Sequence, residues 1–298
     1  MVICKFDKTE DNEVLVITRD NFEKHTNKSK DYIFEVRGKN QYYAYCPSCG
    51  NPIVLVNLYV DQDHNEKKPT VYGKHSVPGN PFDLFNVETY KRCLLKSKNK
   101  IAFSKHEKHR NKDTAEFFKK FLYENIYEIR RFVSHILGIN ISQKQFDRFL
   151  DEFERSEGYY YKGLDIGNLP YLILFLSNQQ NITYQFLNKD SSVELEASIK
   201  GSSYFDIKKT EEQKKNEGQI VHKEIISETL KNRVSIYTVF KHHTYDKNQN
   251  QHMVYEIYEK LKNPDEKAQE TLIVSMKILL DTAYMYNLAR KKEEEKKH

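Results

Sequence analysis

Two cysteines separated by two residues, Cys46 and Cys49, show the spacing in this chain that most directly indicates chemistry. Pro47 and Gly50 place them in a tight turn, and such a turn directs both sulfur atoms toward one point. Zinc favours this arrangement because it binds thiolates at the corners of a tetrahedron. A redox pair and two unliganded thiols are the alternatives. The redox alternative requires a helix N-terminus that lowers a thiol pKa, whereas this pair lies between two expected strands.

A tetrahedral site needs two further ligands, and His75 and Cys93 are the candidates that follow along the chain. The full pattern is Cys46-x2-Cys49-x25-His75-x17-Cys93, with Cys4 and His64 as substitutes. Four protein ligands would leave no position open for water. The sequence therefore predicts a zinc ion with a structural rather than a catalytic role.

The cysteine turn also resembles known zinc modules. Residues 46–54, CPSCGNPIV, resemble the knuckle of zinc ribbons, with Gly and Pro after the second cysteine. Together with VYGKHS at 71–76, the segment is similar to the N-terminal zinc module of competence proteins of the CoiA type, in which a histidine-bearing segment follows the knuckle. The resemblance covers residues 42–93 and implies a small β-rich zinc-binding unit. The nuclease residues of that family have no counterpart that we can place in this chain.

Two segments are candidate surfaces for nucleic acid or another partner. Residues 91–112 hold nine Lys or Arg against one Glu, a composition that can bind phosphates electrostatically; a solvated connecting stretch is the alternative. Residues 156–170 contain three consecutive tyrosines, which suit interfaces and base stacking, although core packing explains them as well. The residues predicted to bind a partner are Lys96, Lys98, Lys100, Lys105, Arg110, Tyr159, Tyr160 and Tyr161.

Catalytic patterns are weaker. No nucleophile elbow, phosphate loop, dinucleotide fingerprint or kinase motif is present. A histidine-rich stretch at 241–252 could form an acid/base site, with His243, Asp246 and Glu256 as the first residues to mutate. The fragment ELEASIK at 194–200 approaches a nuclease signature but could equally be helical. His106 and His109, three apart, could share a helical face as metal ligands. We therefore predict no catalytic residues.

The elements that must position these residues begin with a β-rich segment. β-Branched and aromatic residues predict strands at 13–18, 31–36, 41–46 and 52–60, and a short helix is expected at 87–93. Apolar spacings of three and four predict helices at 113–138 and 142–158. A buried helix at 169–178, strands at 182–187 and 233–246, a polar loop at 208–219, and helices at 252–262 and 264–292 complete the chain.

These elements predict an α+β chain with two domains. A β-rich, zinc-ribbon-like module spans 1–112, and a mainly helical domain with a few strands spans 113–298. The long C-terminal helix is expected to serve either the core or a homo-oligomer contact.

Composition limits the function classes without choosing one. The chain has 298 residues, is 38% apolar and 31% charged, and carries a net charge of +5, which permits a polyanionic partner without requiring one. No apolar run approaches the length of a bilayer span, and the N-terminus has no signal-peptide pattern, so we expect a cytoplasmic protein with reduced thiols.

The preferred hypothesis is a non-catalytic, zinc-stabilised protein that binds a protein or nucleoprotein complex. By size and composition it would suit a phage- or mobile-element-encoded inhibitor of a host defence complex. A metal-dependent nuclease and a nonspecific nucleic-acid-binding protein are the alternatives.

Overall fold

Helices and antiparallel sheets share this chain, as the α+β prediction requires. The computed structural model describes residues 1–8, 13–60, 71–76, 85–96, 108, 111–188, 193–209, 218–246, 250–262 and 268–288. Within these residues, no helix combines the length and the apolar composition that crossing a bilayer requires.

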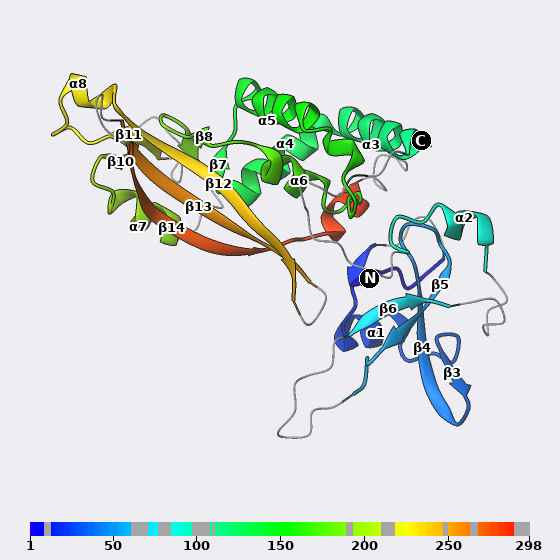
Figure 1. Ribbon diagram of the computed structural model, residues 1–298. Coiled ribbons are helices and arrows are strands. Elements are labelled where there is room, and N and C mark those ends of the chain that lie inside the picture. Colours follow the sequence, from blue (N-terminus) through cyan, green and yellow to red (C-terminus); the bar gives the residue numbers. More distant parts are fainter. Residues whose placement is uncertain are drawn as a thin grey trace.

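The N-terminal part is built on an antiparallel sheet of neighbouring strands in the order β3-β4-β5-β6 (Figure 1). Its elements are β1 (Ile3–Cys4), β2 (Leu15–Val16), α1 (Arg19–Thr26), β3 (Ile33–Val36), β4 (Lys39–Tyr45), β5 (Pro52–Val56), β6 (Tyr72–His75) and α2 (Val87–Lys91). Strands β3, β4 and β5 and helix α2 confirm the expected elements at these places. The buried side chains of Phe22, Ile53 and Leu55 join α1 to the sheet in one hydrophobic core.

Helix α1 and strand β6 were not predicted from the sequence. Helix α1 has a single large apolar residue, Phe22, so it shows no apolar periodicity. Its ends are nevertheless defined, because Thr18 accepts a hydrogen bond from the amide of Asn21 and Asn27 adopts a left-handed conformation at the C-cap. Strand β6 holds Gly73, whose sequence context indicates a turn. The backbone there passes so close to Ile53 that a Cβ would lie 2.7 Å from its Cδ1 atom.

The helices of the second part follow the predicted apolar stripes, with one difference. They are α3 (Lys112–Glu124), α4 (Ile126–Leu137), α5 (Gln143–Arg155), the 3-10 turn η1 (Gly158–Tyr160), α6 (Leu169–Leu176), α7 (Val193–Lys200) and α8 (Glu228–Lys231). The helix expected at 113–138 is interrupted at Asn125, whose side-chain amide donates to the Phe121 carbonyl at 2.7 Å. The Asn125 backbone amide also donates to the Phe121 and Leu122 carbonyls, and its φ of -121° departs from helical geometry, so one helix ends and the next begins at this residue.

Two sheets complete the second part. One has the strand order β14-β13-β12-β8 and the other β10-β11-β9-β7. Their bounds are β7 (Ile139–Asn140), β8 (Gln180–Asn181), β9 (Phe186–Leu187), β10 (Phe205–Lys208), β11 (Gln219–His222), β12 (Val234–Tyr245), β13 (Gln251–Leu261) and β14 (Gln269–Leu279). The strand expected at 182–187 is shorter than predicted, because Tyr184 has a φ of 66° that a strand cannot contain.

The C-terminal helices predicted at 252–262 and 264–292 are wrong, and this part of the chain therefore contains longer strands than expected. Strands β13 and β14 occupy most of these residues, and of the described residues after β14 only 283–288 form a helix. In β13 the buried Met253, Tyr255 and Ile257 alternate with half-buried residues, which is the period of a strand with one face on a core. The long C-terminal helix that was expected to form an oligomer contact is therefore replaced by strand β14.

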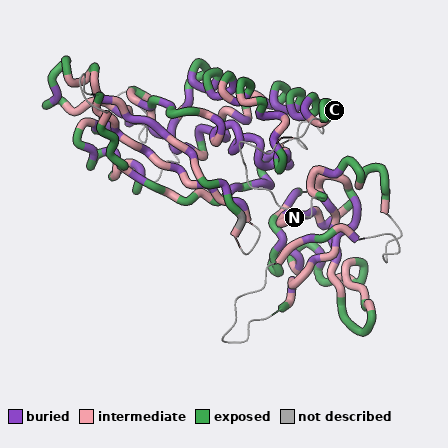
Figure 2. The backbone as a smooth tube through the Cα atoms, in the orientation of Figure 1, coloured by how far each residue is buried: buried purple, intermediate pink, exposed green. Residues whose placement is uncertain are grey.

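Separate hydrophobic cores form in the two parts of the chain (Figure 2). The larger core contains residues between Ala115 and Met285 and includes α6, which is buried along nearly its whole length and contacts β12, α4 and α5. The predicted domain boundary at residue 112 stays a prediction. A third, small cluster of Ile3, Val14, Ala283 and Tyr286 joins the 283–288 helix to the N-terminal strands.

Candidate metal centre

The first two candidate ligands come from the tight turn between β4 and β5. Strand β4 pairs with β5 up to Tyr45 opposite Pro52, so Cys46 and Cys49 lie in the connection that this register closes. The Cys46 carbonyl accepts from the Gly50 amide at 2.9 Å, and the Cys46 amide donates to the Asn51 carbonyl at 2.8 Å. Gly50 has a φ of 69°, which glycine adopts without strain. The turn therefore fixes both cysteines on one small loop.

The third and fourth candidate ligands reach the same place from β6 and from the end of α2. His75 is the last residue of β6 and lies opposite Ile53 of β5, which sets it beside the cysteine turn. Cys93 follows α2, and its amide donates to the Tyr90 carbonyl at 3.1 Å. Three separate segments thus contribute to one cluster.

Asn51 connects the cysteine turn to α2. Its side-chain oxygen accepts from the Asn86 amide at 2.6 Å, and its side-chain nitrogen donates to the Asn86 carbonyl and the Thr89 hydroxyl, each at 3.0 Å. The same nitrogen lies 3.4 Å from the Cys49 sulfur. Sequence analysis missed this residue, and its position two residues after Cys49 is the signal that could have identified it.

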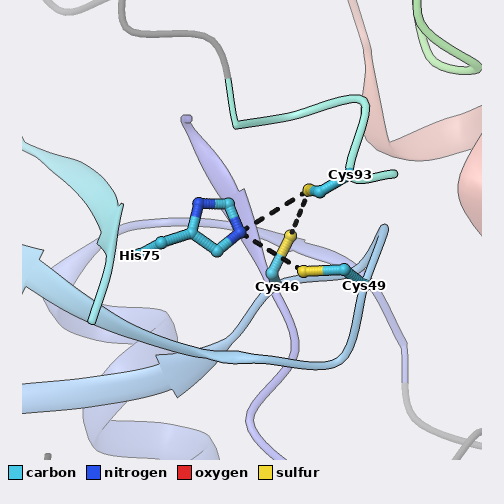
Figure 3. Close-up of side chains that lie close together, drawn as sticks. All are labelled: Cys46, Cys49, His75 and Cys93. Atoms are coloured by element: carbon cyan, nitrogen blue, oxygen red, sulfur yellow. Dashed lines mark hydrogen bonds between the residues drawn. The ribbon is translucent and has the colours of Figure 1, made fainter. Parts of the chain in front are cut away.

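The four ligand atoms converge as a tetrahedral metal site requires (Figure 3). All of them lie within 4.8 Å of one another. The Cys46 and Cys93 sulfurs are 3.7 Å apart, and His75 Nε2 lies 3.3 Å from the Cys49 sulfur and 3.6 Å from the Cys93 sulfur. Zinc bond lengths imply about 3.8 Å between two sulfur ligands and about 3.5 Å between sulfur and nitrogen. The cluster therefore fits a metal ion of this size.

The electrostatics of the three thiols also favour a cation. Burial, together with hydrogen bonds to Cys49 and Cys93, raises the pKa of Cys46. Hydrogen bonds from Cys46 and Cys93 lower the pKa of Cys49. The hydrogen bond with Cys46 lowers the pKa of Cys93, but Cys49 and burial outweigh it and raise this pKa to about 11. The protein alone thus stabilises one thiolate, and three adjacent thiolates need a bound cation.

Cys4 does not join this cluster. It is fully buried in the N-terminal hydrophobic core, and burial raises the pKa of its thiol. His64, the other substitute ligand, lies outside the described residues, as do His106 and His109. The redox alternative for Cys46 and Cys49 requires that the pair begin a helix, whereas the pair lies in the connection between strands β4 and β5.

Four of the five basic residues predicted to bind a partner lie in segments that the structure does not describe. Lys98, Lys100, Lys105 and Arg110 lie outside the described residues. The Lys96 ammonium contacts the Lys91 carbonyl and lies 5.9 Å from the centre of the Tyr90 ring.

Two of the three tyrosines predicted to bind a partner belong to the core. Tyr159 is packed edge-on against Phe153, and Tyr161 is covered by Lys108. Tyr159 is 7% exposed and Tyr161 is 3% exposed, so neither ring is available to a partner. Tyr160 is half-buried. The tyrosine run is explained by core packing, which was the alternative to an interface.

The candidate catalytic residues of the histidine-rich stretch have separate contacts. His243 is buried and its Nε2 atom lies 3.0 Å from Gln251 Oε1. Asp246 pairs with His252 at 3.0 Å, whereas Glu256 pairs with Lys241 at 2.6 Å. His242 is exposed and has a φ of 53°, at the irregularity where the pairing of β12 with β13 shifts register. These contacts do not assemble one acid/base site.

The nuclease-like fragment is helical. Glu194, Glu196 and Lys200 lie on α7, where Lys200 pairs with Glu196 one turn earlier at 2.7 Å. The strand context of a restriction-type nuclease is therefore absent at this fragment.

Comparisons with protein families, with curated proteins and with solved structures found no match to this chain. The chemistry of this protein must therefore be inferred from its own residues, and the cluster of Cys46, Cys49, His75 and Cys93, which could hold a metal ion, is the most specific feature among those described.

Proposed function

We propose that this protein is a non-catalytic binding protein, stabilised by a structural zinc ion, that acts on a protein or nucleoprotein partner. The convergence of Cys46, Cys49, His75 and Cys93 carries the proposal. Three sulfurs and one imidazole form a ligand set that suits zinc, and four protein ligands leave no open position for water or substrate.

The metal would hold together a part of the chain whose own core is small. The N-terminal core has ten buried residues, three of which are the cysteines Cys4, Cys46 and Cys93. Zinc would join the β4–β5 turn, the end of β6 and the end of α2, and such cross-links contribute directly to folding free energy. A rigid surface beside the cysteine turn is the expected result.

The other functions receive less support. The nuclease alternative gains none from the described residues, because Glu196 is helical and because His243, Asp246 and Glu256 each contact a different partner. The role as a phage-encoded inhibitor of a host defence complex stays a prediction, since it rests on size and composition.

Elemental analysis tests the zinc ion directly. We expect one zinc per chain in freshly purified protein, and a lower melting temperature after removal by a chelator, with recovery when zinc is added. Protein without zinc whose four thiols are all alkylated rapidly would contradict the proposal.

Labelled DNA and RNA should remain intact with the protein and Mg²⁺ or Mn²⁺. Turnover of either nucleic acid that Glu196→Ala or His243→Ala abolishes would replace the binding role with an enzymatic one.

Two buried cysteines provide a matched pair of variants. Cys93 is 4% exposed and belongs to the cluster, whereas Cys4 is 0% exposed and does not. We expect Cys93→Ala to lose zinc and Cys4→Ala to retain it, even though both substitutions remove a buried sulfur. Equal zinc content in the two variants would show that Cys93 is not a ligand.

A further inference from the structure

A cleft of about 1280 Å³ lies beside the cysteine turn and reaches the first turn of α3. One wall consists of the residues 46–51 and 91–94, which include the metal ligands Cys46, Cys49 and Cys93. The opposite wall includes Asn111, Thr114 and Phe117. Pockets for small molecules have volumes of about 300–1,000 Å³. The size of this cleft therefore favours an extended ligand.

The charge of the lining favours an anionic ligand. Five cationic side chains line the cleft against two acidic ones: Lys5, Lys8, Lys91, Arg92 and Lys96 against Asp7 and Asp113. Lys91 pairs with Glu88 at 2.8 Å, but both side chains remain exposed to solvent. Within the described part of the chain, no ion pair involves Lys8 or Arg92. An excess of positive charge thus remains for a ligand.

The backbone adds to this charge at one end of the cleft. Helix α3 has 13 residues, and its N-cap Asn111 and first-turn residues Asp113 and Thr114 line the cleft. The amides at a helix N-terminus carry partial positive charge and bind phosphate groups in many proteins.

A buried hydroxyl group gives an independent indication of a ligand. Tyr286 lines the cleft from the 283–288 helix and is 6% exposed. Its hydroxyl oxygen has no hydrogen-bond partner among the described residues. Buried polar atoms are nearly always paired in folded proteins. The oxygen itself is buried, so a hydrogen bond to a ligand, directly or through one water molecule, would supply its missing partner after a small movement of the lining.

Aromatic side chains in the same cleft indicate which class of anionic ligand it would bind. Phe117 is 45% exposed although it is a large apolar residue, and Tyr45 is half-buried. An acidic peptide would use the positive charge but not a bare aromatic ring. Single-stranded nucleic acid uses both, because its phosphates follow the basic groove while its bases stack on aromatic rings.

We propose that this cleft binds single-stranded nucleic acid, with phosphates at Lys8, Arg92 and the first turn of α3, and with a base on Phe117. The inference rests on the proposed function, because the zinc-binding turn forms one wall and the nucleic acid would belong to a nucleoprotein partner. It adds the class of ligand and the place where that ligand binds.

Fluorescence anisotropy with a labelled 12-nucleotide oligothymidylate tests the proposal. We expect saturable binding to the zinc-containing protein, with affinity that falls as salt rises. Each phosphate contact in a single strand contributes about −0.7 to the slope of log K against log salt. The double variant Lys8→Glu with Arg92→Glu should therefore reduce the steepness of this slope by about 1.4 and weaken binding at least tenfold. No binding at low salt by zinc-containing protein would overturn the inference without affecting the zinc proposal.

Control variants separate the cleft from general charge and general aromatic effects. Lys144→Glu with Arg148→Glu makes the same charge change on exposed positions of α5 and should leave the slope unchanged. Phe117→Ala should weaken binding severalfold, whereas Tyr127→Ala, which removes an exposed ring outside the cleft, should not. Equal effects of variant and control, or binding of a polyglutamate peptide in preference to oligothymidylate, would contradict a nucleic-acid cleft.

The variant Tyr286→Phe distinguishes a tyrosine that binds the ligand from one that only stabilises the fold. Because the hydroxyl is unpaired in the free protein, its removal should leave the melting temperature unchanged or raise it. Binding of the oligothymidylate should nevertheless weaken by about fivefold, the loss expected for one hydrogen bond. A lower melting temperature with unchanged affinity would show that the hydroxyl serves the fold and not the ligand.

Discussion

A single polar side chain, that of Asn51, connects the cluster of candidate metal ligands to α2. Asn51 is 1% exposed and links Cys49 to Asn86 and Thr89 through four contacts of its side chain. Residues that orient metal ligands typically change metal affinity about 10–100-fold when they are removed. We therefore expect Asn51→Ala to keep one zinc per chain but to bind it about 10–100-fold more weakly, as measured by competition with a chelating dye.

A second asparagine in the same part of the chain serves as the control. Asn40 is exposed on β4 at the hairpin with β3, so Asn40→Ala should leave zinc affinity unchanged. Unaltered affinity in Asn51→Ala as well would mean that the cysteine turn holds its shape without this side chain.

His243 makes the stability of the protein depend on pH. Burial lowers the pKa of this imidazole to about 4, against an ordinary value of 6.5. As the pH falls below 6.5, the unfolded chain binds a proton that the folded chain does not, so stability decreases until the folded protein also binds it near pH 4. For one such group, the free energy of unfolding should fall by about 2 kcal/mol between pH 7 and pH 5.

The variant His243→Gln isolates this contribution from the other titrating groups. Glutamine can hydrogen-bond to Gln251 and does not titrate, so urea unfolding of the variant should lack about 2 kcal/mol of the pH dependence seen in the natural protein. The carboxylates whose pKa values are lowered, such as Asp246 and Glu256, lose their stabilising effect only at more acidic pH and remain in both proteins. The same pH dependence in both proteins would contradict a buried neutral imidazole.

Among the elements, what could be predicted from the sequence depended on whether the pattern was local. The cysteine turn, the apolar stripes of α3, α4 and α5, and the apolar run of α6 could be predicted, because these patterns act within a few residues of one another. The break between α3 and α4 at Asn125 could not, since the apolar stripe continues through it. Strands β13 and β14 were misassigned because their apolar residues also fit helical spacings of three and four, although Val254, Tyr255 and Ile257 in β13 favour strands. The antiparallel pairing of β13 with its neighbours β12 and β14 decides between the two periods in favour of strands.

The buried face of β13 provides a test of the strand assignment. Ile257 is fully buried against the larger core, whereas Val254 lies on the other face and is half-buried. We expect Ile257→Ala to lower the free energy of unfolding by about 2–5 kcal/mol, and Val254→Ala by less than about 1 kcal/mol. Urea denaturation measures both. Similar losses at the two positions would contradict the alternation of a one-sided strand.

At the scale of the whole molecule, the N-terminal strands contact the 283–288 helix. Asn287 accepts a hydrogen bond from the Val14 amide at 2.7 Å and donates one to the Val14 carbonyl at 3.1 Å. Ala283 and Tyr286, from the same short helix, pack with Ile3 and Val14. The N-terminal strands are thus attached to the second part of the chain by the 283–288 helix. This contact also holds Tyr286 at the proposed nucleic-acid cleft, so cleft and attachment depend on the same residues.

Asn287→Ala tests whether this contact fixes the two parts of the chain relative to one another. The substitution leaves the amide and carbonyl of Val14 without their partner, and the lost hydrogen bonds should cost about 1–3 kcal/mol. We expect a larger radius of gyration in X-ray scattering and faster trypsin cleavage, with zinc content unchanged because the metal ligands lie elsewhere. Asn178→Ala, which removes an exposed amide bonded to Glu152, should alter neither measurement. If the radius of gyration stays constant in Asn287→Ala while the oligothymidylate still binds, the parts are held together by the packing of Ala283 and Tyr286, and the side-chain pairing is secondary.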